Sequence, residues 1–236
     1  MKADDVFGNI EFSTNLKAKS IRVRILVDGL KVTLPYGISK QSAIDFIQDS
    51  ADKILKKQEK LKAHTQSNPY FLEENTAIST LTFEIIFTKV SRTDIFFQLK
   101  NNQLKIEFPL NSDHKSVVSQ KNCWNGIKYF LQKEAKRLLP ERTRQLAMNN
   151  GFIYSSVKIQ SSKTRWGSCS RYKSINLSYY LMLLPAHLID YVILHELCHT
   201  RQMNHSEKFW KEMDTVTQYK SKALRKELKK HQIPNF

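Results

Sequence analysis

The residues best suited to chemistry form the pattern H-E-x-x-H at residues 195–199, and a third histidine, His205, follows six residues later. Positions i and i+4 of a helix share one face, so His195 and His199 can bind one metal ion together. Glu196 lies about 100° further round the helix, where its carboxylate can act as a base on water held by that ion. Three protein ligands, with the fourth position left to water, are typical of a catalytic zinc site. The pattern therefore predicts a Zn2+-dependent hydrolase.

The alternative is a partly exposed helix that carries these histidines by chance. The pattern H-E-x-x-H arises by chance in roughly one sequence of this length and composition in a hundred. Leu188 and Val192 recur at helical spacing with His195 and His199, so the ligand face continues an apolar, buried face. Imidazoles buried there without a metal would need other polar partners, because burying an unsatisfied polar group is costly. The metal site is the favoured interpretation.

The elements that must position these residues lie on both sides of the motif. Two strands are expected at residues 157–160 and 175–178, and the helix that carries the motif at 186–203. Two further helices are expected at 206–216 and 219–231.

The exit from the motif helix must turn the chain so that His205 can return to the metal. Metzincins place a glycine three residues after the second histidine of the motif, and here Gln202 occupies that position. Asn204 tolerates left-handed backbone geometry, so we expect it to make the turn.

The N-terminal half is β-rich. Residues 8–34 are expected to form strands with a hairpin turn at Asp28-Gly29, and Ser39 should cap one helix that runs to about residue 63. Residues 81–108 are predicted to form an antiparallel meander that turns at Asn101-Asn102.

A long helix is expected after the meander. Pro140 should kink or restart it, because proline removes a backbone donor in mid-helix, and Gly151 should end it. We expect an α+β fold with a division at residues 109–114, which gives an N-terminal region at 1–112 and a second domain at 113–236.

Composition limits the class of protein. With 236 residues, 41% hydrophobic and 25% charged, the chain is expected to be globular. Three widely spaced cysteines argue against a disulfide framework. The first residues lack the apolar stretch of a signal peptide, and no apolar run approaches the length of a membrane span. We therefore expect a cytoplasmic protein that does not associate with membranes.

The net charge of +16 predicts attraction to polyanions, so nucleic acid or nucleotides are candidate partners of a basic surface. Scattered, solvated lysines explain the same charge. The basic residues of the last predicted helix could bind phosphates, but a solvated amphipathic face is the favoured explanation. They are Lys220, Lys222, Arg225, Lys226, Lys229 and Lys230.

Several segments together resemble the YgjP-like metallopeptidase family, which is related to the SprT-like and WLM zincins. They are Arg-Trp-Gly-Ser-Cys at 165–169, Ile-Asn-Leu at 175–177, the H-E-x-x-H motif, Asn-His-Ser at 204–206 and Phe209-Trp210. The resemblance is strong over residues 157–220 and looser over the N-terminal half. It implies that residues 113–236 form a zincin-like domain, in which a small antiparallel sheet and helices carry the motif. It also implies zinc held by His195, His199 and His205, with Glu196 as the base.

Four further residues are candidates for binding substrate. Arg165 and Tyr219 could stabilise an oxyanion, although Tyr219 could equally be packed and Arg165 could pair with a carboxylate. Trp166 and Gly167 could form a strand edge where the missing side chain admits a substrate backbone, and an ordinary bulge is the alternative. Four other histidines lack ligand spacing and are given no role; they are His64, His114, His187 and His231.

The favoured function is a zinc metallopeptidase that cleaves the peptide bonds of a peptide or protein substrate. One alternative is a metal-dependent hydrolase of a phosphate compound such as a nucleoside triphosphate, because high positive charge accompanies a water-activating metal. Against it, phosphoryl transfer usually uses magnesium bound by carboxylates. A second alternative is a DNA-associated binding protein with a vestigial zinc site. Glu196 argues against that alternative, because a structural site would not require it.

Overall fold

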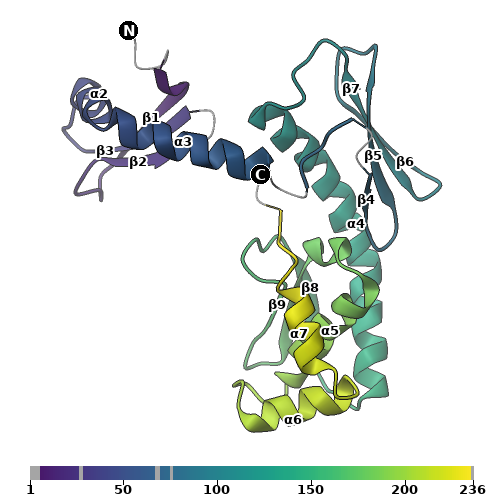
Figure 1. Ribbon diagram of the computed structural model, residues 1–236. Helices are drawn as coiled ribbons and strands as arrows, with labels where there is room; N and C mark the ends of the chain where they lie inside the picture. Colours follow the sequence, from purple (N-terminus) through teal and green to yellow (C-terminus); the bar gives the residue numbers. More distant parts are fainter. Residues whose placement is uncertain (1–5, 27–28, 67–69, 75–76, 235–236) are drawn as a thin grey trace. The chain divides into compact units, whose positions relative to one another are not determined.

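The computed structural model describes residues 6–26, 29–66, 70–74 and 77–234, and it combines small sheets with helices (Figure 1). It therefore confirms the α+β fold class. The chain divides into two compact units, one formed by Met1–Phe71 with Lys115–Gln120 and the other by Leu72–His114 with Lys121–Phe236. The division into domains at 1–112 and 113–236 stays a prediction.

The first unit contains a three-stranded sheet of order β1-β3-β2, formed by β1 (Asn9–Asn15), β2 (Arg22–Ile25) and β3 (Gly29–Pro35). The expected antiparallel pair is present as β2 and β3. Strand β1 pairs parallel with β3. Asp28, the first residue of the predicted hairpin turn, lies outside the described residues.

Two helices cover one face of this sheet and close its core. They are α2 (Lys40–Asp49), which Ser39 caps by accepting from the backbone N–H of Ser42, and α3 (Ala51–Gln66). The prediction of one continuous helix is wrong, because the Ser50 N–H bonds the carbonyls of Ile47 and Gln48 in a tight final turn that ends α2. The core residues alternate along β3 and recur at helical spacing on the helices. They include Leu30, Val32, Leu34, Ala43, Ile47 and Ile54.

The second unit begins with a sheet of order β4-β5-β7-β6. Its strands are β4 (Ala77–Ser79), β5 (Glu84–Val90), β6 (Phe96–Lys100) and β7 (Gln103–Pro109). The predicted turn at Asn101-Asn102 is confirmed: both residues have positive φ, 51° and 58°, and join β6 to β7 as a hairpin. The predicted antiparallel meander is wrong, because β7 returns between β6 and β5 and so pairs parallel with β5.

A single long helix, α4 (Val117–Asn149), follows and contains Pro140 without a break. The predicted restart at Pro140 is therefore wrong. Ala135, Leu139 and Thr143 are fully buried on one continuous face that passes the proline. Packing of that face maintains the helix against a local cost of about 3 kcal/mol for a mid-helix proline. Gly151, with φ 65°, follows the helix end as expected.

The sheet nearest the motif has the order β8-β10-β9, with β8 (Ser156–Gln160), β9 (Gly167–Cys169) and β10 (Ser174–Ser178). It is mixed, so the expectation of a purely antiparallel sheet is wrong in that detail. The β9–β10 pair is antiparallel, and β10 lies between β9 and β8, where it must run parallel to β8. Within the described ranges, β1-β3-β2 and β5-β7-β6 share this arrangement, in which the central strand runs parallel to one neighbour and antiparallel to the other.

A short 3-10 helix, η1 (Tyr179–Leu183), leads to the last three helices, α5 (Ala186–Cys198), α6 (Glu207–Val216) and α7 (Ser221–Leu228). Helix α5 contacts β9, β10, α6 and α7, so it is the element around which this part of the unit packs (Figure 1). It ends before the predicted residue 203, since the N–H groups of Thr200 and Arg201 donate in tight turns to the carbonyls three residues back, those of Leu197 and Cys198. Within the described residues, no helix combines the length and apolar character required to cross a membrane.

Candidate metal centre

Three histidine side chains converge at the end of α5. The Nε2 atom of His195 lies 3.2 Å from Nε2 of His199 and 3.1 Å from Nε2 of His205. One ligand atom from each residue lies within 4.8 Å of the others. His195 is in the last turn of α5 and His199 is its C-cap, whereas His205 comes from the segment just before α6. The structure thus brings together the three residues that the sequence nominates as ligands.

The turn between His199 and His205 differs from the prediction. Asn204 is not among the described residues with positive φ, so a left-handed Asn204 does not make the turn. His199 Nδ1 instead lies 3.0 Å from the carbonyl oxygen of Gln202. A hydrogen bond donated by Nδ1 to this carbonyl leaves Nε2 as the free acceptor, which is the tautomer that a metal ligand requires.

Two aromatic residues at the start of α6 hold the imidazole rings in place. The fully buried Phe209 ring stacks on His199, with centroids 4.6 Å apart, and meets His195 and His205 edge to face. The Trp210 ring stacks on His205 at 5.8 Å. These contacts anchor α6, and they also restrict the rotation of all three candidate ligands.

The residues fit a tetrahedral metal ion. Zn–N bonds of about 2.0–2.1 Å place tetrahedral ligand atoms about 3.3 Å apart, close to the observed separations. Burial, followed by the neighbouring His199 and His205, lowers the pKa of His195 to about 3. Burial also lowers the pKa of His199. Both rings are therefore neutral at neutral pH, as metal ligands must be.

One further observation supports the fit. Nδ1 of His195 is buried and has no hydrogen-bond partner among the described residues. The ring makes its polar contacts through Nε2 alone, which faces the other two histidines. A cation at that point would receive the Nε2 lone pairs of the three rings, which neutral imidazoles cannot all satisfy for one another, and it would not reach the unpaired Nδ1.

Glu196 lies beside this cluster and packs against strand β9. Burial raises the pKa of its carboxyl group to about 8 in the absence of metal, and the charge of Arg165 acts in the opposite direction. A Cβ atom on Gly167 would lie 2.7 Å from Oε1 of Glu196 and 2.8 Å from its Cγ. The space left by the missing side chain of Gly167 is therefore occupied by Glu196, which explains the need for glycine there.

A cavity of about 370 Å³ opens beside His195 and Glu196. Its lining includes three of the predicted substrate-binding residues, Arg165, Trp166 and Gly167. The fourth, Tyr219, is 85% exposed in the turn between α6 and α7, and it does not line this cavity.

Other cavity residues were not expected from the sequence. Tyr191 comes from α5, whereas Arg225, Lys229 and His231 come from α7 and the residues after it. The favoured explanation of the basic face of α7 as merely solvated is therefore incomplete. The i, i+4 spacing of Arg225 and Lys229 puts them on one face. Nothing in the sequence indicates that this face turns towards α5.

The cysteines near the site belong to the packing. Cys198 is fully buried, and burial raises the pKa of its thiol to about 12. Burial also raises the pKa of Cys169, to about 11. Thiols that remain protonated at neutral pH are poor nucleophiles, and the described cysteines form no disulfide.

Comparison with known families gives one match that spans most of the chain, a YgjP-like family described as "YgjP-like, metallopeptidase domain", over residues 19–231. Among curated proteins, none matches the chain. Similar solved structures include the metallopeptidase zymogens of Pyrococcus abyssi abylysin and Methanocaldococcus jannaschii jannalysin. Each is 22% identical over 38% of this chain, with TM-scores of 0.35 and 0.34 and coverage of 90% and 92% of those chains.

Proposed function

The chain belongs to the YgjP-like metallopeptidase family, which makes it an enzyme of the peptidase class that uses a divalent metal, and from this we propose that it is a zinc-dependent peptidase with Glu196 as its general base. The observation that carries the proposal is the convergence of three histidine Nε2 atoms, together with the buried Glu196 that lines the same cavity as His195.

His195, His199 and His205 would hold the zinc ion. When bound, zinc polarises a carbonyl group and lowers the pKa of water towards about 7. The histidine donor set supports zinc over magnesium, which prefers oxygen ligands. The hydrogen bond between His199 and the Gln202 carbonyl and the stacking of Phe209 and Trp210 orient the ligands.

Glu196 would take a proton from the attacking water on its carboxylate and then deliver it to the leaving amine. A carboxyl group whose pKa is raised by burial is well matched to both steps. A dication nearby would lower that pKa again and favour the ionised form as the starting state. Gly167 keeps the carboxylate in place, because any side chain there would displace it.

Arg165 is the candidate that we retain for substrate binding and for stabilising the oxyanion. It lines the cavity beside Glu196, and its charge acts on that carboxylate. Trp166 lines the same cavity and would contribute an apolar contact to the substrate. A role for Tyr219 stays a prediction that would require the turn after α6 to move.

The test begins with metal analysis of the purified full chain, where we expect about one zinc ion per chain. Wild type and Glu196→Gln would then be assayed in parallel against a peptide library and a nucleotide panel. We expect wild type to cleave peptides and Glu196→Gln to retain zinc but lose hydrolysis by at least about a hundredfold. Glu207→Gln is the matched control, because Glu207 is an exposed carboxylate on α6.

Three results would contradict the proposal: a metal-free wild type, unchanged turnover in Glu196→Gln, or release of phosphate without peptide cleavage. Binding of nucleic acid by the basic surface and a cytoplasmic location stay predictions. DNA binding measured across salt concentrations tests the first, because contacts to phosphates weaken steeply as salt rises.

A further inference from the structure

The cavity beside the metal centre carries an excess of positive charge. Its lining contains Arg165, Arg225 and Lys229, and Glu196 is its one carboxylate. A dication held by the three histidines would add to that excess, since neutral imidazole ligands do not neutralise it. Like charges gathered in one cavity repel one another, so an anion that enters it is stabilised.

None of these three cations forms an ion pair with a carboxylate of the described residues, and Arg165 acts on Glu196 through its charge alone. Within the described part of the chain, the structure records no ion pair for Arg165, Arg225 or Lys229. Other arginines of the same unit do have partners: Arg142 pairs with Asp190 at 2.5 Å and Arg201 pairs with Glu212 at 2.7 Å. Three cations without an ion pair are thus gathered where a substrate would lie.

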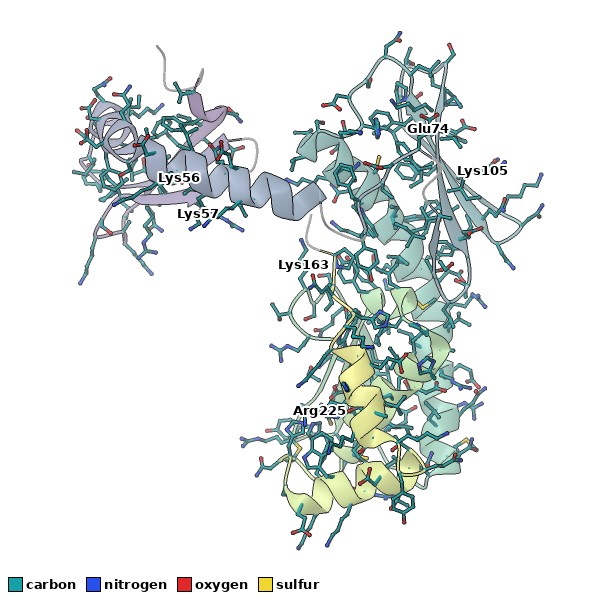
Figure 2. The ribbon with its side chains drawn as sticks, viewed as in Figure 1. Lys56, Lys57, Glu74, Lys105, Lys163 and Arg225 are labelled. Atoms are coloured by element: carbon teal, nitrogen blue, oxygen red, sulfur yellow. The ribbon has the colours of Figure 1, made fainter. Side chains whose placement is uncertain are left out.

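Arg225 is held in a fixed orientation beside the site. Its guanidinium group lies over the ring of Trp210, 4.7 Å from the centroid, and that ring in turn stacks on His205. Figure 2 labels Arg225 on α7, drawn in yellow. Stacking uses the face of a guanidinium group and leaves the N–H groups along its edge to bind an anion in a bidentate manner.

A second cavity shows that this charge is local. It has a volume of about 650 Å³ and shares Arg165 and Gly167 with the first cavity. Its other lining residues are neutral, and they include Gln132, Asn176 and Ser178. An anionic group of a substrate would therefore be drawn to the side of the site formed by α7.

We propose that Arg225, together with Lys229 and Arg165, recognises a carboxylate of the peptide substrate beside the metal centre. The carboxylate would come from an acidic side chain next to the cleaved bond or from a free peptide C-terminus. This proposal rests on the proposed peptidase function for the identity of the ligand. It makes Arg225 a residue that determines specificity.

The test measures binding of three small probes to the full chain with its metal. N-acetyl-glutamate α-amide carries only a side-chain carboxylate, N-acetyl-glutamine carries only a terminal one, and N-acetyl-glutamine amide carries none. Binding is followed by tryptophan fluorescence, since Trp166 lines the cavity and Trp210 lies beneath Arg225. ATP serves as the phosphate-bearing comparison.

We expect wild type to bind one of the two carboxylate probes at least about tenfold more tightly than N-acetyl-glutamine amide. Arg225→Gln should remove that preference, Arg225→Lys should restore part of it, and Lys229→Gln should weaken it. Lys226→Gln is the matched control, because Lys226 lies on α7 but not in the cavity lining. The preferred probe identifies the source of the carboxylate.

Equal binding of the three probes to wild type would overturn the proposal. A preference that survives in Arg225→Gln would also overturn it, because groups other than Arg225, such as the metal, would then bind the carboxylate. Arg225-dependent binding of ATP without a carboxylate preference would assign the cavity to nucleotides instead. Binding requires no turnover, so a chain that shows the preference but cleaves no peptide would contradict the proposed function and not the recognition site.

Discussion

Helices α5 and α7 both contribute to the site, and they do so by different means. Helix α5 buries nine of its 13 residues and provides His195 and Glu196, with His199 as its C-cap. Helix α7 buries little besides Ser221 and provides Arg225 to the cavity wall. The spacing of ligands along α5 is fixed by the helix itself, whereas the contribution of α7 depends on how that helix packs. The metal centre should therefore tolerate changes in α7 that alter what the cavity binds.

The largest effect is expected from His195→Ala on α5. Removal of this ligand leaves two histidines, and we expect metal affinity to fall by more than about a hundredfold, measured by metal analysis after dialysis. His187→Ala is the matched control, because His187 lies on the same helix but points to Glu227 of α7 at 2.8 Å. Equal metal loss in His195→Ala and His187→Ala would mean that metal binding depends on the contact between α5 and α7 as much as on the ligand itself.

Gly167→Ala should affect chemistry and leave the metal in place. The new Cβ would lie 2.7 Å from Oε1 of Glu196, so the carboxylate must move. We expect kcat to fall by about 10- to 100-fold with unchanged zinc content, since small displacements of a catalytic group are costly. Ser168→Ala on the same strand is the control and should retain activity. Full activity in Gly167→Ala would show that the position of Glu196 is not critical.

Arg201→Gln tests the turn that follows α5. Arg201 donates to the carbonyl of Gly151 and to Glu212, and it lies over the Phe152 ring at 4.3 Å. It thereby ties the end of α4 to α6. We expect a loss of about 1–2 kcal/mol in the free energy of unfolding, measured with urea. Arg144→Gln, which breaks an exposed pair with Glu141 within α4, should cost less than about 0.5 kcal/mol. Equal losses of unfolding free energy in Arg201→Gln and Arg144→Gln would show that Arg201 contributes no more to stability than an exposed ion pair does.

The contrast between α5 and α7 also explains which features of the site can be predicted from the sequence. The ligands and base were predictable because H-E-x-x-H fixes the relative directions of His195, Glu196 and His199 once a helix forms. Two of the three strands around them, β8 and β10, and the three helices were visible as apolar periodicity, whereas the short β9 was not predicted as a strand. Ser39 and Gly151 were recognised as helix boundaries because caps are local features of backbone geometry.

Features that depend on packing between distant segments were not predictable. The insertion of β7 beside β5 and the unbroken passage of α4 through Pro140 both override local preferences. The approach of Glu196 to Gly167 joins residues that the sequence shows only as separate motifs. Arg225 enters the cavity because α7 packs on α5, and no pattern within residues 221–228 specifies that partner.

The smallest effect is expected where α5 and α7 meet through His187 and Glu227. These side chains are 53% and 41% exposed, so a double-mutant cycle of His187→Ala and Glu227→Gln should give a coupling of only about 0.2–1 kcal/mol in urea unfolding. The buried hydroxyl of Ser221, which donates to Asp214, and the stacking of Arg225 on Trp210 would remain to hold α7. Zinc content should therefore match wild type in all variants of the cycle. A coupling above about 2 kcal/mol would instead mean that this pair is the main interaction that holds α7 against α5. Loss of zinc in the same variants would then show that the metal centre depends on the packing of α7.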